Sequence, residues 1–223
     1  MKLYDNEISS AASRVRIALA LKNVPYEKLQ IGILGPDAEN RQSGYLSVNP
    51  QGLVPALLTD QGSLITQSLA IIEYLDEVYP KPSLLSENAE DRAFSRSIAL
   101  LIAAEIHALL PPRIRARLLG IPGFGTADVT AWNWHWILEG MNAVEALLAS
   151  RKQTRFSAGD NPSVADVFLF PQAINTERAG ADLAQWPHLS RIVSSLRTIP
   201  AFAENAPVAA NPAAAPQPVA ATV

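Results

Sequence analysis

Two hydrophobic patterns alternate over the first 80 residues. Short runs rich in apolar and β-branched residues are typical of strands, and they occur as KLYD at 2–5, YEKLQI at 26–31, VPALLT at 54–59 and SLIT at 63–66. Residues 10–22 and 67–79 instead carry apolar side chains at i, i+3 and i+4 spacing, which predicts helices with one buried side. TDQGS at 59–63 supplies turn residues between two of the strands. The pattern predicts an α/β domain over residues 1–80.

The character of the chain changes at Pro80 and Pro82, because a proline cannot continue the preceding helix. Residues 81–87 are therefore predicted to form a linker. Beyond it only helical periodicity remains, over residues 88–119, 126–150, 163–179 and 187–198. This predicts an all-helical domain over residues 88–205. Residues 206–223 are mainly alanine and proline, without charge or aromatic rings, and are expected to form a loose tail.

Composition and charge exclude several classes of protein. Hydrophobic residues make up 48% of the 223 residues and charged residues 17%, the balance of a globular protein with a sizeable core. No run approaches the roughly 18 uninterrupted apolar residues of a membrane span, and the start, MKLYDNE, lacks the apolar stretch of a signal peptide. We therefore expect a cytoplasmic protein without a membrane partner. The net charge of −3 offers no broad positive surface for nucleic acid.

The chain contains no cysteine. This excludes a disulfide framework, a thiolate zinc site and a sulfur nucleophile supplied by the protein itself. The histidines His107, His135 and His188 show no metal-ligand spacing to one another or to acids, so no metal site is predicted. Any thiol chemistry must use a thiol that arrives as a ligand.

Two serines precede the first predicted helix, in SSAASRVRIALALK at 9–22. One serine is enough to cap the helix, since its oxygen accepts a hydrogen bond from an unpaired backbone N–H. The same free N–H groups and the helix dipole also make this end a site for an anion. A hydroxyl that donates to a thiolate lowers the thiol pKa from its free value of about 8.5. Ser9 and Ser10 therefore have two interpretations, a helix cap and a thiolate site.

Three further motifs join this one: NPQGLVPALL at 49–58, QSLAIIEYLDE at 67–77 and AGDNPSVADVFLFPQAIN at 158–175. Together the four stretches resemble the glutathione transferase superfamily, and within it the zeta class, which includes maleylacetoacetate isomerase and maleylpyruvate isomerase. The resemblance covers about residues 1–205. It implies an N-terminal thioredoxin-like domain followed by a C-terminal all-helical domain, with glutathione as the cofactor and a homodimer as the assembly.

The resemblance also implies which residues contact glutathione. Ser9 would face the sulfur, with Ser10 and the amide of Ala11 beside it. The remaining contacts would come from Asn40, Val54, Pro55, Gln67 and Ser68. Val54–Pro55 lies where the family has a cis peptide, although a trans proline at the first residue of a strand is the structural alternative. Gln67 and Ser68 would bind the γ-glutamyl carboxylate, or they simply cap a helix.

The pocket for the second substrate departs from the family pattern. Bacterial zeta members typically have an arginine immediately before the paired serines, and this chain has Ile8. The signature cysteine is Ala11, and the asparagine-containing stretch after the helical histidine has become residues 110–112, Leu-Pro-Pro. Arg113 and Arg178 remain as candidates to hold a carboxylate, although a solvated helix face also explains Arg113. Ile8, Arg113 and Arg178 are therefore the predicted substrate-binding residues.

Three functions follow from these residues. A transferase of zeta-like type would add the glutathione thiolate to a small electrophile, or displace a group from it, and leave sulfur on the product. A glutathione-dependent cis–trans isomerase would use the same addition, rotate the former double bond and eliminate glutathione unchanged. A non-catalytic glutathione-fold binding protein would be expected to lack the hydroxyl that faces the thiolate, yet both serines are present. The altered pocket favours the transferase.

The stretch SVAD at 163–166 has a structural interpretation. A serine followed three residues later by an acid forms a capping box at the start of a helix. We therefore predict that Ser163 and Asp166 begin the helix over residues 163–179 and take no part in chemistry.

Overall fold

The structure, a computed structural model, describes residues 1–35 and 37–210. Within these ranges one sheet forms, with the strands β1 (Lys2–Asp5), β2 (Glu27–Gln30), β3 (Ala56–Leu58) and β4 (Leu64–Thr66) in the order β2-β1-β3-β4. β1 pairs in parallel with β2, while the pairs β1–β3 and β3–β4 are antiparallel. The predicted hairpin at 59–63 is confirmed, since it joins β3 to β4.

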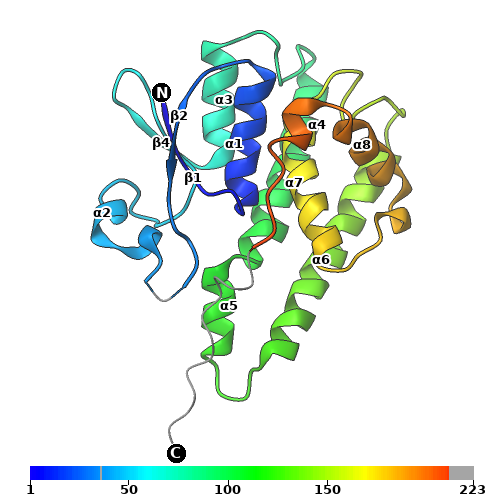
Figure 1. Ribbon diagram of the computed structural model, residues 1–223. Helices are drawn as coiled ribbons and strands as arrows, with labels where there is room; N and C mark the ends of the chain where they lie inside the picture. Colours follow the sequence, from blue (N-terminus) through cyan, green and yellow to red (C-terminus); the bar gives the residue numbers. More distant parts are fainter. Residues whose placement is uncertain (36, 211–223) are drawn as a thin grey trace, which may run out of the picture.

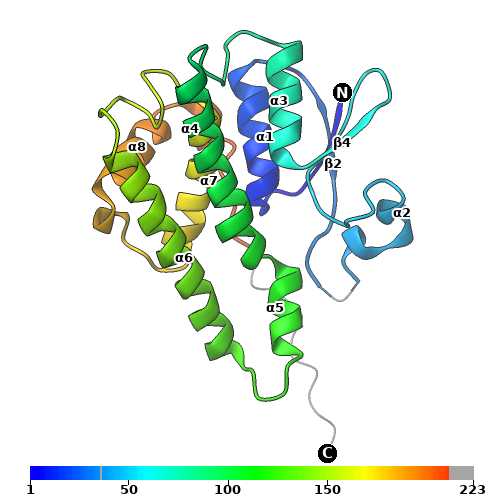
Figure 2. The ribbon, with the colours of Figure 1, turned by 180° about the vertical axis from the view of Figure 1, so that it is seen from behind.

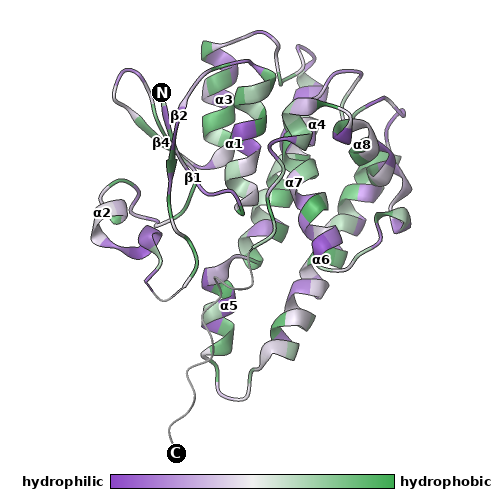
Figure 3. Ribbon diagram, viewed as in Figure 1, coloured by the Kyte–Doolittle hydropathy of each residue, from purple (hydrophilic) through white to green (hydrophobic). Residues whose placement is uncertain are grey.

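Two helices cover the sheet and carry the core from the first domain into the second. α1 (Ser10–Leu21) and α3 (Ser68–Val78) lie side by side against the sheet (Figure 1). Figure 3 shows that both are largely hydrophobic. α1 also packs against α7 (Val164–Arg178), so buried residues of the sheet, α1 and the C-terminal helices form one continuous hydrophobic cluster. The thioredoxin-like domain plus helical domain predicted from the sequence is therefore the fold observed.

The C-terminal helices are α4 (Ala89–Leu100), α5 (Pro112–Leu119), α6 (Thr126–Ala149), α7, α8 (Pro187–Arg197) and α9 (Pro200–Ala203). α4, α6, α7 and α8 pack together, while α5 and the first turns of α6 extend away from the rest of the molecule (Figure 2). The helices predicted over 126–150, 163–179 and 187–198 are confirmed within two residues at each end.

The helix predicted over residues 88–119 is interrupted. After α4 the backbone forms a π-helical turn at Leu101–Ile106 and a 3-10 turn at His107–Leu109, and Pro111 and Pro112 then start α5. The two prolines lack the amide donors that a continuous helix would need, which explains the break. In length and apolar composition the whole stretch Ala89–Leu119 would suffice to cross a membrane.

A short helix, α2 (Ser43–Leu46), lies between β2 and β3, where the hydrophobic pattern predicts neither helix nor strand. A 3-10 turn, Glu39–Arg41, precedes it. Tyr45 is buried against Ile31 and Val54, and its hydroxyl donates to the carbonyl of Leu53 at 2.7 Å. Tyr45 thus anchors α2, a helix with too few residues to show a hydrophobic period in the sequence.

The first residues of the predicted tail, from Ala206 on, contact the folded part of the chain. Ala206 packs against the core, Pro207 is buried, and the amide of Val208 donates to the carbonyl of Glu7 at 2.9 Å. The chain here runs along α1, where Ser13 Oγ donates to the carbonyl of Asn205 at 2.6 Å. Residues 206–208 are therefore held by contacts that the composition of the tail does not reveal. Residues 211–223 lie outside the described part of the chain.

Candidate active site

Two adjoining cavities open at the N-terminus of α1. The first, the cis-proline cavity, has a volume of about 560 Å³ and is lined by Ala11, Pro55, Gln67 and Ser68 among others. The second, the α5–α7 cavity, has a volume of about 470 Å³. Its lining includes Ile8 and Ser9 of the β1–α1 loop, Ser10 of α1, Arg113 of α5, and Gln172 and Asn175 of α7. The walls of both include Leu53, Val54, His107, Pro111 and Arg113. A ligand in one cavity would therefore lie next to a ligand in the other.

The paired serines face the α5–α7 cavity and make different hydrogen bonds. Ser9 is the N-cap of α1, and its Oγ accepts a hydrogen bond from the amide of Ala12 at 3.2 Å. Ser10 is buried, and its Oγ lies 3.1 Å from His107 Nδ1. The cap interpretation of Ser9 is confirmed. Because the Ser9 oxygen acts there as an acceptor, its own proton is available for a second partner.

His107 lies on the border of both cavities. In the sequence it shows only as a histidine inside an apolar helical run that ends at two prolines, without metal-ligand spacing to other residues. Burial, with the charges of Arg14 and Arg113, lowers its pKa from 6.5 to about 3. The imidazole is therefore neutral at pH 7. In the described ranges 1–35 and 37–210, no group of three or more acidic or histidine side chains could hold a metal ion.

A close helix contact positions the turn that carries His107. Gly140 of α6 faces Ile106, the residue immediately before His107, and a methyl group on Gly140 would lie 2.2 Å from Ile106 Cγ1. No real side chain tolerates that separation, so glycine is required for α6 to approach the π-helical turn.

Substituting Gly140→Ala is expected to push Ile106 and His107 toward the cavities. Overpacking of this kind lowers the free energy of unfolding by about 1–3 kcal/mol, even though alanine is the better helix former. Urea denaturation measures the loss of stability. The affinity for a ligand of the two cavities measures the displacement of His107. Gly44→Ala is the matched control, since nothing lies within 4 Å of the place that a methyl group would occupy on this helical glycine. Equal stability of the two variants would contradict the argument.

The cis-proline cavity brings together the residues predicted for one end of a peptide ligand. The Val54–Pro55 bond is cis. Gln67 has a left-handed backbone, with φ of 71°, and its Nε2 donates to Gln51 Oε1 at 2.9 Å. Ser68 begins α3 and its Oγ accepts a hydrogen bond from Arg14 Nη1 at 3.3 Å. A left-handed conformation in a residue other than glycine is typical of a functional site, because the surroundings must hold it there.

Asn40 has a structural contact that the sequence does not suggest. Its Nδ2 donates to the carbonyl of Gly52 at 2.7 Å, which supports the loop before Val54. The side-chain oxygen is buried without a partner in the described part of the chain, and the residue lines the α5–α7 cavity. Asn40 therefore both holds the loop and borders the predicted site.

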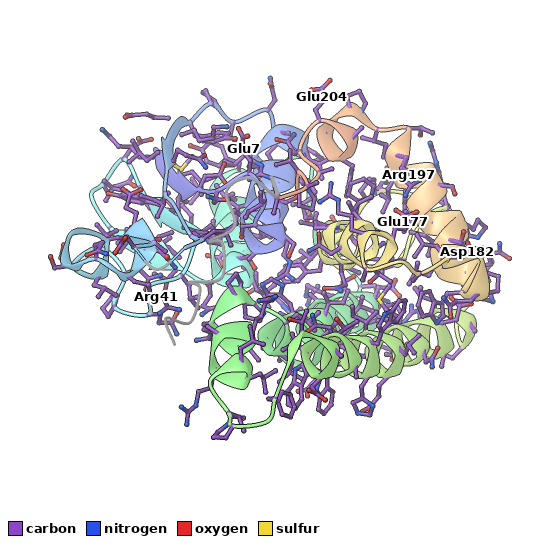
Figure 4. The ribbon with its side chains drawn as sticks, turned by 60° about the horizontal axis from the view of Figure 1, so that its bottom comes forward. Glu7, Arg41, Glu177, Asp182, Arg197 and Glu204 are labelled. Carbon is purple, nitrogen blue, oxygen red and sulfur yellow. The ribbon has the colours of Figure 1, made fainter. Side chains whose placement is uncertain are left out.

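The structure separates the two predicted arginines. Arg113 lines both cavities, whereas Arg178 is exposed and lines neither. Arg178 is the last residue of α7, one turn beyond Asn175, and its neighbour Glu177 pairs with Arg197 of α8 (Figure 4). The expected contact of Arg178 with the substrate pocket is therefore absent from this arrangement, because α7 carries the residue past the cavity.

Other cavity residues were not predicted. Arg41, labelled in Figure 4, comes from the 3-10 turn before α2 and lines the α5–α7 cavity. Gln172 and Asn175 reach it from α7, and Arg14 lines the cis-proline cavity. Ile8 does border the α5–α7 cavity, as expected.

Comparisons with known proteins agree with this geometry. Residues 8–78 match the family model for the glutathione S-transferase N-terminal domain, and residues 137–193 match the model for its C-terminal domain. Maleylacetoacetate isomerase of Pseudomonas aeruginosa is 42% identical over 93% of this chain and 96% of that protein. Maleylpyruvate isomerase of a Ralstonia species is 41% identical over 94% of this chain and 98% of that protein.

Solved structures give the same result. The holo structure of maleylpyruvate isomerase, a bacterial glutathione S-transferase of the zeta class, is 39% identical and superimposes with a TM-score of 0.87, covering 96% of this chain and all of that one (100%). The maleylacetoacetate isomerase of Methylobacterium extorquens AM1, solved with malonate and glutathione bound, is 36% identical with a TM-score of 0.87. The match covers 93% of this chain and 96% of that one. This chain therefore belongs to the glutathione S-transferase family, in its zeta class, and is a glutathione-dependent enzyme.

Proposed function

We propose that this enzyme stabilises the glutathione thiolate at the N-terminus of α1 and delivers it to a small unsaturated electrophile in the α5–α7 cavity. One observation carries the proposal: Ser9 and Ser10 line the α5–α7 cavity, while the next residue, Ala11, lines the cis-proline cavity. A peptide thiol bound along Val54 therefore has its sulfur at the junction of the two. The partial positive charge of the helix N-terminus favours the ionised sulfur there.

Ser9 is the proposed donor to the sulfur. Its oxygen already accepts from the Ala12 amide, which leaves its proton for the thiolate. Ser10 and His107 share a hydrogen bond, and the neutral imidazole accepts the Ser10 proton at Nδ1 in this proposal. Ser10 then orients His107 rather than the sulfur. Gln67 and Ser68 hold the γ-glutamyl carboxylate at the N-terminus of α3, and Asn40 borders the site from the loop before Val54.

The walls of the α5–α7 cavity indicate the class of electrophile. Ile8, Ile33, Leu110 and Pro111 contribute apolar lining to the cavity, and Arg41 and Arg113 supply two cations. An α,β-unsaturated carbonyl compound with a carboxylate at one or both ends fits these walls. In the reaction the thiolate forms a C–S bond at the β-carbon, the displaced electron pair moves to the carbonyl oxygen, and protonation of the α-carbon leaves a thioether.

Isomerisation is the second candidate, and it is favoured by the names of the relatives, which are isomerases of maleylacetoacetate and maleylpyruvate. The first half of the reaction is the same. The C–C bond of the adduct then rotates as a single bond, and loss of the thiolate restores the double bond in the trans geometry. Glutathione is regenerated, so the product has the mass of the substrate.

The mass of the product distinguishes conjugation from isomerisation. The enzyme is incubated with glutathione and, in turn, maleylpyruvate, maleylacetoacetate, an enone and an activated halide. Conjugation adds the mass of glutathione to an addition product, while isomerisation leaves the mass unchanged and shifts only the retention time. The proposal fails if none of these substrates is converted faster than in a reaction without enzyme.

We also propose that the enzyme is a twofold dimer in which the first domain packs on the helical domain of the partner. Leu64 of β4 and Leu100 at the end of α4 are large apolar residues that are 38% and 51% exposed. The most apolar 18-residue window of Ala89–Leu119 is only 28% buried within the chain. Exposed large apolar side chains of this kind support a protein interface, and Leu100 also borders the cis-proline cavity.

Sedimentation equilibrium at micromolar concentration is expected to give twice the chain mass of 24.0 kDa. Leu100→Glu should shift the equilibrium toward the monomer, because it places a charge in the buried interface. Leu138→Glu, at an exposed leucine of α6, serves as the control and should leave the mass unchanged. A 24.0 kDa particle for the unsubstituted enzyme would contradict the dimer.

A further inference from the structure

Arg14 is a buried cation beside the cis-proline cavity. It lies one turn into α1, is only 1% exposed, and lines the cavity together with Gln67 and Ser68. Its Nη1 donates to Ser68 Oγ at 3.3 Å, and its Cζ lies 4.4 Å above the ring of Phe168 in α7. Its Nε and Nη2 have no hydrogen-bond partner among residues 1–35 and 37–210.

The environment of Arg14 differs from that of Arg16, two residues further along the same helix. Arg16 is also buried, but its Nη1 contacts Asp5 Oδ1 at 2.5 Å and the carbonyl of Asn6 at 3.2 Å. Glu73, a carboxylate that lines the same cavity, is paired with Arg96 instead. Burial lowers the pKa of Arg14 to about 9, so it stays protonated at pH 7. A charge held in this way without a counter-ion is costly, and a bound anion would offset that cost.

The hydrogen bond to Ser68 sets the direction of the serine hydroxyl. A serine oxygen has one proton and two lone pairs. Arginine can only donate, so it occupies a lone pair of Ser68 Oγ and leaves the serine proton free to donate into the cavity. Ser68 is thereby kept as a donor, and a donor at the N-terminus of α3 suits an anion.

We propose that Arg14 is a positioning residue for the α-carboxylate of the γ-glutamyl group: it holds Ser68 as a hydrogen-bond donor and supplies the positive charge that the bound carboxylate neutralises. The inference rests on the proposed binding of this carboxylate at Gln67 and Ser68. A purely structural role, through the contact with Phe168, makes a different prediction, because loss of Arg14 would then destabilise the protein whether or not a ligand is bound.

The test compares two ligands by isothermal titration calorimetry. One is glutathione, and the other is γ-aminobutyryl-cysteinyl-glycine, which lacks only the α-carboxylate of the γ-glutamyl group. The unsubstituted enzyme should bind glutathione at least 10-fold more tightly. Arg14→Met should lose about 10- to 100-fold in glutathione affinity and little in affinity for the analogue, as expected for a hydrogen-bonded charge. The melting temperature of the ligand-free Arg14→Met enzyme should be unchanged or higher, since a buried unpaired charge has been removed.

Arg16→Met is the matched control. It leaves the buried Asp5 without its cation, so it should lower the melting temperature while keeping the ratio of the two affinities. If Arg14→Met does not fold, Arg14→Gln replaces it, and the prediction for the ratio is the same.

The inference is overturned if the Arg14 variant still prefers glutathione by the same ratio as the unsubstituted enzyme. It is also overturned if both affinities and the melting temperature fall together, which is the structural outcome. If the unsubstituted enzyme binds glutathione and the analogue equally, the inference fails while thiolate activation stands. If it binds neither, the proposed function itself fails.

Discussion

Replacing Ser9 with alanine is expected to raise the pKa of the thiol of enzyme-bound glutathione by about one to two units. Hydrogen bonds to charged groups contribute about 1.5–3 kcal/mol, and one pKa unit corresponds to about 1.36 kcal/mol. Losing the donor disfavours the thiolate, so the pH–rate profile should move to higher pH by the same amount. An ultraviolet titration of the thiolate measures the shift directly, and no cysteine of the chain contributes to it.

Ser9→Gly separates the two functions of this residue. Glycine is nearly as good an N-cap as serine, whereas alanine in that position costs about 1 kcal/mol. The two variants should therefore share the thiol pKa shift while only Ser9→Ala loses stability. Ser10→Ala should change the thiol pKa less, because Ser10 is bonded to His107. An unshifted thiol pKa in Ser9→Gly, with glutathione still saturating, would mean that Ser9 is a cap and nothing more.

Replacing Asp166 with alanine is expected to cause a large loss of stability. Asp166 is fully buried and accepts four hydrogen bonds, from the amide and hydroxyl of Ser157 at 2.9 and 2.6 Å and from those of Ser163 at 2.7 and 2.9 Å. Burial raises the pKa of Asp166, and these hydrogen bonds oppose that rise. Alanine would leave two buried amides unsatisfied, at about 1–3 kcal/mol each, so the free energy of unfolding should fall by about 3 kcal/mol or more.

Asp128 provides the control for this measurement. It occupies the same position in α6, where its Oδ2 accepts from the amide of Gly125 at 2.7 Å, but this hydrogen bond is exposed and the glycine has no side chain to return a second one. Asp128→Ala should cost only about 1 kcal/mol, as for an ordinary cap. Urea denaturation of both variants gives the comparison. Similar losses of unfolding free energy in the two variants would show that the buried network at Asp166 stabilises the protein no more than an exposed cap does.

The capping box also shows what local sequence can predict. Ser163 and Asp166 are three residues apart, so the bond that starts α7 is visible in the spacing. The same holds for Ser9 as the cap of α1 and for the hairpin between β3 and β4. These elements depend on hydrogen bonds between near neighbours and on a hydrophobic period, and both can be read from a few adjacent residues.

Motifs in the sequence predicted only part of the candidate site. Val54, Pro55, Gln67 and Ser68 were assigned from motifs, and the structure gathers them in one cavity. Arg178 was assigned in the same way, yet α7 carries it past the α5–α7 cavity, which Gln172 and Asn175 line instead. A motif names a residue type at a position in a helix, but the packing of that helix decides which turn faces the cavity.

By itself, then, the sequence determined the two-part fold, the helix and strand order, the serine pair at the start of α1 and the requirement for a thiol from outside. The tertiary structure alone decided that His107 meets Ser10, 97 residues away, and that Arg14 lies behind Ser68, 54 residues away. Nothing in the spacing of those residues records their contact. It arises because α1 packs between α3 and α7, and because Gly140 lets α6 come close to the π-helical turn that leads into His107.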